Sequence, residues 1–111
     1  MVFPAAERSH EDGLAQNGSW YYLDESGAML AGKWLKYGGI WYYLGSNGAM
    51  KTGWIRVDGN WYYMNSDGSM RTGWLKLGDT WYYFRSSGEM VTGQQWIDGR
   101  TYYFNSKGEL N

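Results

Sequence analysis

Pairs of short runs in which hydrophobic and polar residues alternate recur along most of the chain, and a dipeptide typical of tight turns separates the two runs of each pair. In the clearest pair, residues 54–57 precede Asp58-Gly59 and residues 60–64 follow it. Asp-Gly supplies the positive φ angles that a two-residue hairpin turn requires. The pattern therefore predicts an antiparallel β-hairpin in which Trp54 lies opposite Tyr63.

Side chains alternate between the two faces of a strand, so this hairpin is expected to have two different faces. The first face carries Trp54, Arg56, Trp61 and Tyr63, and the second carries Ile55, Val57, Tyr62 and Met64. Tyr62 and its equivalents Tyr42 and Tyr82 are assigned to the packed core between hairpins. The first face also carries a charge, which indicates that it reaches solvent.

The hairpin pattern repeats with a period of about 20 residues, which marks a small unit stacked on copies of itself. Trp-Tyr-Tyr triplets begin at Trp20, Trp41, Trp61 and Trp81, and a degenerate fifth triplet begins at Thr101. A polar loop with a central Gly follows each triplet, and no stretch shows the periodicity of a helix. Because a lone hairpin is marginally stable in water, we predict an all-β solenoid of stacked hairpins.

Five repeat units are predicted, at residues 17–31, 32–52, 53–72, 73–92 and 93–111. The first unit lacks the front of its hairpin, and the fifth has Gln94-Gln95-Trp96 where the third and fourth have Gly-Trp. Residues 1–16 do not match the repeat and are interpreted as a terminal cap, a linker or a tag. They also lack the basic start and the apolar stretch of a signal peptide.

Composition narrows the classes of partner. The 111 residues have room for one domain, and 8 Trp and 11 Tyr account for much of their hydrophobic content. A net charge of -1 argues against nucleic acid, which calls for a basic face. Cysteine is absent, which excludes disulfides and thiol catalysis, and no apolar run approaches the length of about 18 residues that a membrane span needs. No cofactor and no metal site is expected.

The aromatic face suggests a ligand. Two Trp from one hairpin and a Tyr on the same face of the next can form three walls of a box with few strong hydrogen-bond donors. A quaternary ammonium ion suits such a box, because it carries a diffuse positive charge and has no N–H groups to satisfy. Cation–π attraction is worth ~2 kcal/mol or more for a good desolvated contact. Choline-like groups are therefore the natural candidate.

The motif Gly-Trp-x4-Gly-x-Trp-Tyr-Tyr-x4-Gly-x-Met-x-Thr-Gly, which spans Gly53 to Gly73, resembles the choline-binding repeat of Gram-positive surface proteins such as pneumococcal autolysins and adhesins. The resemblance extends over residues 17–111. It implies a left-handed solenoid of β-hairpins with choline sites between consecutive hairpins. It also implies an extracellular, non-catalytic module that docks onto choline or phosphocholine groups of cell-wall teichoic acids.

In that family, each site takes two Trp from one hairpin, together with the last Tyr of the next triplet and the Met of the loop after it. The resemblance implies sites formed by Trp34, Trp41, Tyr63 and Met70; by Trp54, Trp61, Tyr83 and Met90; and by Trp74, Trp81 and Tyr103, where Leu110 replaces Met. A site formed by Trp20, Tyr43 and Met50 is expected to be weak or empty, because Gly13 stands where its second Trp would be.

Other interpretations of these residues remain open. The Trp pairs can be a stacking core without a ligand, and Met70 and Met90 can merely fill gaps between hairpins. Lys36, Arg56 and Lys76 are interpreted as stems lying along Trp rings rather than as phosphate ligands, although a phosphocholine phosphate can still use them. No catalytic role is expected. His10 is the single His and lies outside the repeats, and no carboxylate pair suited to glycoside hydrolysis is apparent.

Carbohydrate binding is the main alternative function. Residues 97–105 are similar to aromatic repeats of the glucan-binding domains of streptococcal glucosyltransferases and of clostridial toxins. A sugar would need hydrogen-bond partners beside the stacking rings, so competition between choline and a glucan separates the two hypotheses. A third possibility is a purely structural, self-associating or engineered repeat protein.

Overall fold

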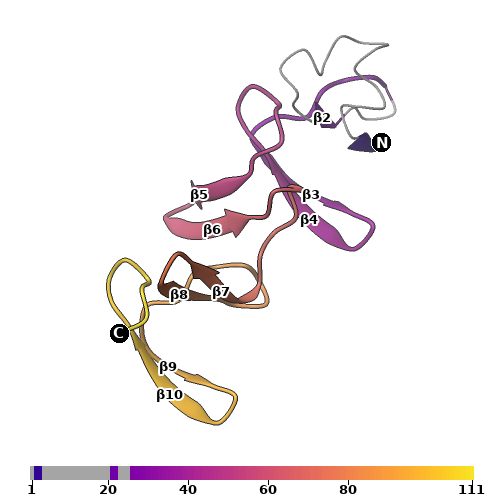
Figure 1. Cartoon of the computed structure of the whole chain (residues 1–111). Helices are drawn as coiled ribbons and strands as arrows, with labels where there is room; N and C mark the ends of the chain where they lie inside the picture. The colour runs from indigo at the N-terminus through magenta and orange to yellow at the C-terminus, as the bar shows by residue number, and fades with distance from the viewer. Residues whose placement is uncertain (1, 4–20, 23–25) are drawn as a thin grey trace. The chain divides into compact units, whose positions relative to one another are not determined.

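The computed structural model describes residues 2–3, 21–22 and 26–111 (Figure 1). In those residues every regular element is a β-strand, and there is no helix that could cross a membrane. The all-β class is therefore confirmed. The predicted turn at 17–18, most of the segment 1–16, and Trp20 lie outside the described residues.

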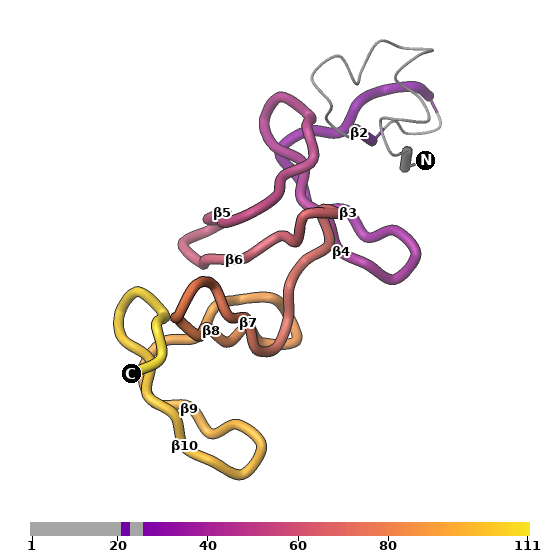
Figure 2. Tube along the Cα trace, in the orientation of Figure 1, coloured from indigo at the N-terminus to yellow at the C-terminus, as the bar shows by residue number. Residues whose placement is uncertain are grey.

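Each predicted hairpin within residues 33–104 is present. The pairs are β3 (Lys33–Tyr37) with β4 (Ile40–Leu44), β5 (Gly53–Val57) with β6 (Asn60–Met64), β7 (Gly73–Leu77) with β8 (Thr80–Phe84), and β9 (Gly93–Ile97) with β10 (Arg100–Phe104). Trp34 lies opposite Tyr43 and Trp74 lies opposite Tyr83, which is the register that a two-residue turn predicts. Figure 2 traces the loop that follows each hairpin.

Two of the hairpin turns, Asp58-Gly59 and Asp98-Gly99, have the backbone conformation that their sequence predicts. Asp58 and Gly59 have φ angles of 52° and 84°, and Asp98 and Gly99 have φ angles of 49° and 82°. Two consecutive positive φ values define the type I′ turn, whose twist matches that of the strands on either side. The Asp-Gly sequences therefore fix both the turn and the register of their hairpins.

The N-terminal region contains a strand pairing that the repeat pattern did not predict. The backbone of β1 (Val2–Phe3) pairs antiparallel with β2 (Tyr21–Tyr22), so that Phe3 lies opposite Tyr21. Residues 2–3 thus supply a strand partner in the unit that lacks the front of its hairpin.

The chain divides into two compact units, one formed by residues 1–53 and 64–69 and the other by residues 54–63 and 70–111. In the second unit, the end of each loop acts as a short third strand. Met90 bridges antiparallel to Phe84 of its own hairpin, and its backbone N–H donates to the carbonyl of Trp61 at 2.8 Å. Leu110 N–H donates in the same way to the Trp81 carbonyl at 2.9 Å. Consecutive hairpins of this unit are therefore joined through backbone hydrogen bonds.

Unlike faces of consecutive hairpins pack together in the second unit. Val91, Ile97 and Phe104 form a buried cluster, and Trp74, Tyr83, Tyr102 and Leu110 pack around it. Trp74 and Tyr83 come from the first face of the β7–β8 hairpin, whereas Tyr102 and Phe104 come from the second face of the β9–β10 hairpin. Stacked hairpins are confirmed, and in this unit the Trp face of one meets the aliphatic face of the next.

Phe84 is the clearest test of this packing. Its side chain is fully buried, and its ring centroid lies 5.8 Å from that of Trp54. We expect Phe84→Ala to lower the free energy of unfolding by about 3–5 kcal/mol, because the cavity it leaves is closed on all sides. Urea denaturation measures this loss. The exposed Thr92 serves as a control, since Thr92→Ala is expected to change stability by roughly 0.5 kcal/mol or less. A loss below about 1 kcal/mol for Phe84→Ala would contradict the packing.

Candidate ligand-binding site

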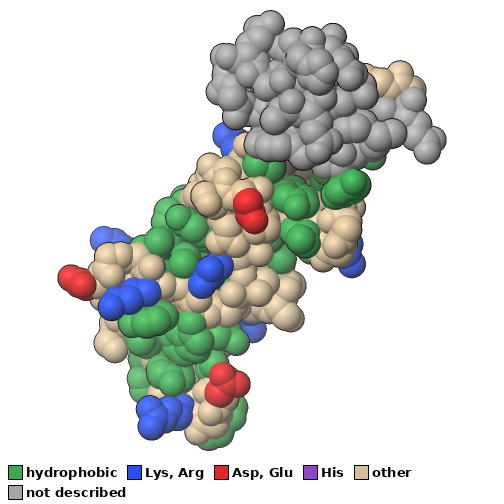
Figure 3. All heavy atoms as spheres, turned by 45° about the vertical axis from the view of Figure 1, so that its right-hand side comes forward, with side chains coloured by type: hydrophobic (Ala, Val, Ile, Leu, Met, Phe, Trp, Pro, Cys, Tyr) green, Lys and Arg blue, Asp and Glu red, His purple; other side chains and the backbone are tan. Residues whose placement is uncertain are grey.

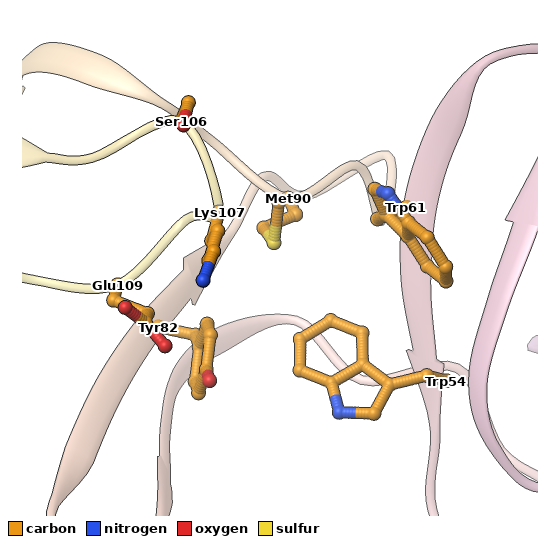
Figure 4. Close-up of a pocket in the computed structure, with 7 residues that line it drawn as sticks. All are labelled: Trp54, Trp61, Tyr82, Met90, Ser106, Lys107 and Glu109. Atoms are coloured by element: carbon orange, nitrogen blue, oxygen red, sulfur yellow. The ribbon is translucent and has the colours of Figure 1, made fainter.

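A cavity of ≈ 460 Å³ lies beside the first face of the β5–β6 hairpin (Figure 4). Its aromatic and apolar walls are Trp54, Trp61, Tyr82 and Met90, and we refer to it as the Trp54 slot. The loop after β10 adds polar walls, namely Ser106, Lys107 and Glu109. The volume falls in the range of small-molecule sites, which is roughly 300–1,000 Å³.

The rings of the Trp54 slot meet at steep angles. The centroids of Trp54 and Trp61 lie 6.1 Å apart with an interplanar angle of 86°, and those of Trp54 and Tyr82 lie 5.0 Å apart at 69°. Edge-to-face contacts of this kind are favourable. Figure 4 shows the Trp54 ring broadside and the Trp61 ring tilted relative to it. The rings are not stacked flat on one another, so an electron-rich opening remains between them.

Backbone geometry holds each wall in place. Trp54 and Trp61 project from the same face of paired strands, and Trp54 also rests on Phe84 of the following hairpin. Met90 is positioned through its N–H bond to the Trp61 carbonyl. Gly108 of the next loop lies directly against it, since a Cβ at Gly108 would collide with Met90 Sδ. Met90 is thereby positioned as one wall of the slot.

The tyrosine of the slot differs from the expected one. The sequence interpretation places Tyr83 beside Trp54 and assigns Tyr82 to the core, whereas the structure brings Tyr82 to Trp54 and puts Tyr83 against Trp74 at 5.0 Å. Adjacent residues of a strand point to opposite faces, so only one of the two can face the preceding hairpin. Because unlike faces meet in this stack, that residue is Tyr82.

Burial raises the pKa of the Tyr82 hydroxyl, and the negative charge of Glu109 raises it further. The phenol therefore stays neutral well above physiological pH. Glu109 lies beside Tyr82 at the edge of the slot and comes from the loop after β10.

A second cavity of ≈ 360 Å³ repeats the arrangement one hairpin later. It is lined by Trp74, Trp81, Tyr102 and Leu110, and we call it the Trp74 slot. The Trp74 and Trp81 centroids lie 6.0 Å apart at 89°, and those of Trp74 and Tyr102 lie 4.9 Å apart at 73°. Leu110 occupies the Met position, as predicted. Tyr102 again takes the place expected for its neighbour, because Tyr103 points away from the slot and is 55% exposed.

For the other two sites that the resemblance implies, the structure describes only part of the arrangement. Trp34 and Trp41 form a perpendicular pair with centroids 6.3 Å apart in the first unit. Tyr63 and Met70 belong to the second unit, so the site that joins these four residues stays a prediction. Trp20 and Gly13 of the site expected to be weak lie outside the described residues; Tyr43 packs against Trp34, and Met50 lies against Gly68.

Basic side chains cover the outer Trp of each pair. Lys36 Nζ lies 5.8 Å from the ring centroid of Trp41, Arg56 Cζ lies 5.9 Å from that of Trp61, and Lys76 Nζ lies 5.8 Å from that of Trp81. These positions agree with the prediction that the three side chains lie along Trp rings. Figure 3 shows hydrophobic side chains that reach the surface with Lys and Arg beside them. Each cation therefore lies close to the ring of one indole of its Trp pair.

Family models match most of the chain. The choline-binding repeat model matches residues 14–52 and 51–94, and a cell wall binding repeat model matches residues 94–110. The chain therefore belongs to the choline-binding repeat family. A comparison with curated protein sequences gives no match.

Solved structures of two Streptococcus pneumoniae proteins and of one phage endolysin share the fold. Choline binding protein F is 52% identical with a TM-score of 0.78, over 84% of this chain and 32% of that protein. The choline binding domain of Spr1274 is 42% identical with a TM-score of 0.64, over 74% of this chain and 95% of that domain. A pneumococcal cell wall endolysin from phage Cp-1, complexed with choline, is 45% identical with a TM-score of 0.58, over 85% of this chain and 28% of the endolysin. The chain thus spans about a third of choline binding protein F.

Proposed function

We propose that this chain is a non-catalytic module that binds choline or phosphocholine groups of cell-wall teichoic acids in the Trp54 and Trp74 slots. The observation that carries the proposal is the Trp54 slot itself, where two perpendicular indoles, a phenol and a thioether enclose one cavity. Such a module holds the protein to which it belongs at the outer surface of a choline-bearing bacterial wall.

The chemistry of the slot favours a methylated cation. A trimethylammonium group has no N–H, so it loses few hydrogen bonds when it enters a cavity walled by aromatic rings. The faces of Trp54, Trp61 and Tyr82 carry negative electrostatic potential, and each good contact is worth ~2 kcal/mol once water is excluded. Met90 adds a polarisable contact without competing as a hydrogen-bond donor.

Relatives support this choice. The phage Cp-1 endolysin was solved in complex with choline, and the family to which the chain belongs is named for choline-binding repeats. That relative is an endolysin, and this chain matches 28% of it. We therefore assign attachment, rather than catalysis, to the repeats.

Choline titration followed by Trp fluorescence tests the proposal. We expect a saturable change in the millimolar range, because each slot is open to water and offers about two or three aromatic contacts. Tetramethylammonium is expected to act in the same way, and a soluble glucan is expected neither to cause the change nor to compete with it. No response to choline over that range, or displacement of choline by the glucan, would contradict the proposal.

A further inference from the structure

Four of the loops that follow a hairpin receive the sulfur of an earlier methionine. A Cβ added at the central Gly of each loop would collide with Sδ of that methionine, in the pairs Met29 with Gly48, Met50 with Gly68, Met70 with Gly88, and Met90 with Gly108. The four glycines have positive φ angles of 82–100°, which bring bare backbone against the thioether. The sulfur atoms are therefore packing atoms that link one loop to the next.

Met90 differs from a core methionine because it also lines the Trp54 slot. Its side chain is half-buried, whereas that of Met64 is fully buried. Figure 4 shows the yellow sulfur atom of Met90 on the side of the residue that faces Trp54 and Tyr82. The cavity of ≈ 460 Å³ admits a small oxidant to this sulfur, since a water molecule takes up only about 30 Å³ of liquid.

The Trp74 slot has no sulfur at the equivalent position. Leu110 lines that slot as Met90 lines the Trp54 slot, and each of the two residues donates its backbone N–H to a Trp carbonyl of the preceding hairpin. Leucine offers an apolar wall of similar size but no thioether for an oxidant to attack. The two slots therefore have equivalent walls that differ in their sensitivity to oxidation.

We propose that Met90 is an oxidation site through which peroxides weaken ligand binding in the Trp54 slot but not in the Trp74 slot. The peroxide transfers one oxygen atom to Sδ: an S–O bond forms and the O–O bond breaks. The thioether is oxidised by two electrons to the sulfoxide, and hydrogen peroxide is reduced to water. Methionine sulfoxide reductases reverse this modification. The inference rests on the proposed function, since it names a regulation of a slot expected to hold a choline cation.

The sulfoxide does not fit the wall that the thioether forms. Gly108 closes one side of Sδ, so the new oxygen has room on the cavity side, where it takes up space that the ligand uses. The oxygen is also a polar acceptor in an apolar wall, and Lys107 lines the same cavity with a charged donor. Pairing of the oxygen with Lys107 would hold an ammonium group in the slot, where it repels a cationic ligand.

Choline titration before and after mild treatment with hydrogen peroxide tests the inference. Peptide mass spectrometry locates each added oxygen, and the indole N–H signals of Trp54 and Trp74, assigned by Trp→Phe substitution, report the two slots separately in NMR spectra. We expect oxidation of Met90 to weaken choline at the Trp54 slot about three- to tenfold and to leave the Trp74 slot within about twofold. Treatment with methionine sulfoxide reductases should restore the original affinity.

Three variants separate Met90 from general oxidative damage. Met90→Leu reproduces the wall that Leu110 forms in the Trp74 slot, so peroxide should cause no further change in its choline affinity. Met29→Leu removes a methionine that is 43% exposed and lines neither slot, and it should keep the peroxide sensitivity of the unmodified chain. Met90→Gln places a polar side chain at the site permanently and should weaken choline at the Trp54 slot without any peroxide.

The rate of oxidation gives an independent measurement. A cation bound in the slot covers the Met90 sulfur, so saturating choline should slow the oxidation of Met90 relative to that of the exposed Met29. Met64 should be oxidised last, because its side chain is fully buried. A Met90 rate that choline leaves unchanged, or oxidation of Met64 before Met90, would count against the inference.

The outcome for affinity distinguishes this inference from the proposed function. Unchanged choline affinity of the Trp54 slot after complete oxidation of Met90, or an equal loss at both slots, would overturn the inference alone. Absence of choline binding at either slot before any peroxide is added would overturn the proposed function instead.

Discussion

Replacing Trp61 with alanine is expected to weaken choline binding in the Trp54 slot about thirtyfold. Trp61 supplies one of the two indole faces, and a desolvated cation–π contact is worth ~2 kcal/mol, where 1.4 kcal/mol corresponds to a tenfold change. The chain should stay folded, because Trp61 is 39% exposed and the buried Ile55 and Met64 of its hairpin are untouched. Site-resolved choline titration by NMR, followed on the Trp54 indole, measures the loss.

Trp96 offers the matched control. It also projects from a hairpin strand, but it is 73% exposed and lines neither the Trp54 nor the Trp74 slot. Trp96→Ala should leave choline affinity at both slots within about twofold of the unmodified chain. Unchanged affinity at the Trp54 slot in Trp61→Ala, or an equal loss in Trp96→Ala, would show that the cation does not sit against Trp61.

The second large effect is expected at Gly108. Its φ angle is +82°, and an added Cβ would collide with Met90 Sδ. Gly99 has the same φ of +82°, but a Cβ there would meet no atom within 4 Å. Both Gly→Ala variants should lose about 1–2 kcal/mol of folding free energy from backbone strain. Gly108→Ala should lose a further 1–3 kcal/mol, roughly, from overpacking, and should also weaken choline in the Trp54 slot by displacing Met90.

A double-mutant cycle identifies the cause. Met90→Ala makes room for the new methyl group, so Gly108→Ala should cost less in that background than in the unmodified chain. Denaturant unfolding of the four proteins gives the coupling energy. Equal costs for Gly99→Ala and Gly108→Ala, or no coupling with Met90, would show that the loop does not press on the Met side chain.

Local elements could be predicted because their determinants are local. Asp58-Gly59 and Asp98-Gly99 specify the type I′ turn, and the alternation around them sets the two faces of each hairpin. The same alternation predicts the Trp pairs, because it places Trp74 and Trp81 on one face of their hairpin. In the structure, the rings of this pair are perpendicular. These inferences need no knowledge of the neighbouring hairpin.

The choice between Tyr82 and Tyr83 depends on that neighbour. The alternation of side chains along a strand places Tyr82 and Tyr83 on opposite faces. It does not determine which of these faces meets the Trp pair of the preceding hairpin. The hydrogen bond from Met90 N–H to the Trp61 carbonyl fixes this, because it sets the way in which consecutive hairpins stack. Lys107 and Glu109 were missed for a similar reason, since they reach the Trp54 slot from a loop far along the chain. The sequence offers one signal for Glu109, because a Glu precedes both Met90 and Leu110.

The central claim is that the Trp face of one hairpin and the opposite face of the next enclose a single cation. Intermolecular nuclear Overhauser effects from the methyl protons of bound choline test it most directly. The structure predicts contacts from these methyl groups to the ring protons of Trp54, Trp61 and Tyr82 and to the Met90 methyl group. Contacts to Tyr83 in place of Tyr82, or saturable binding without any contact to these rings, would contradict it.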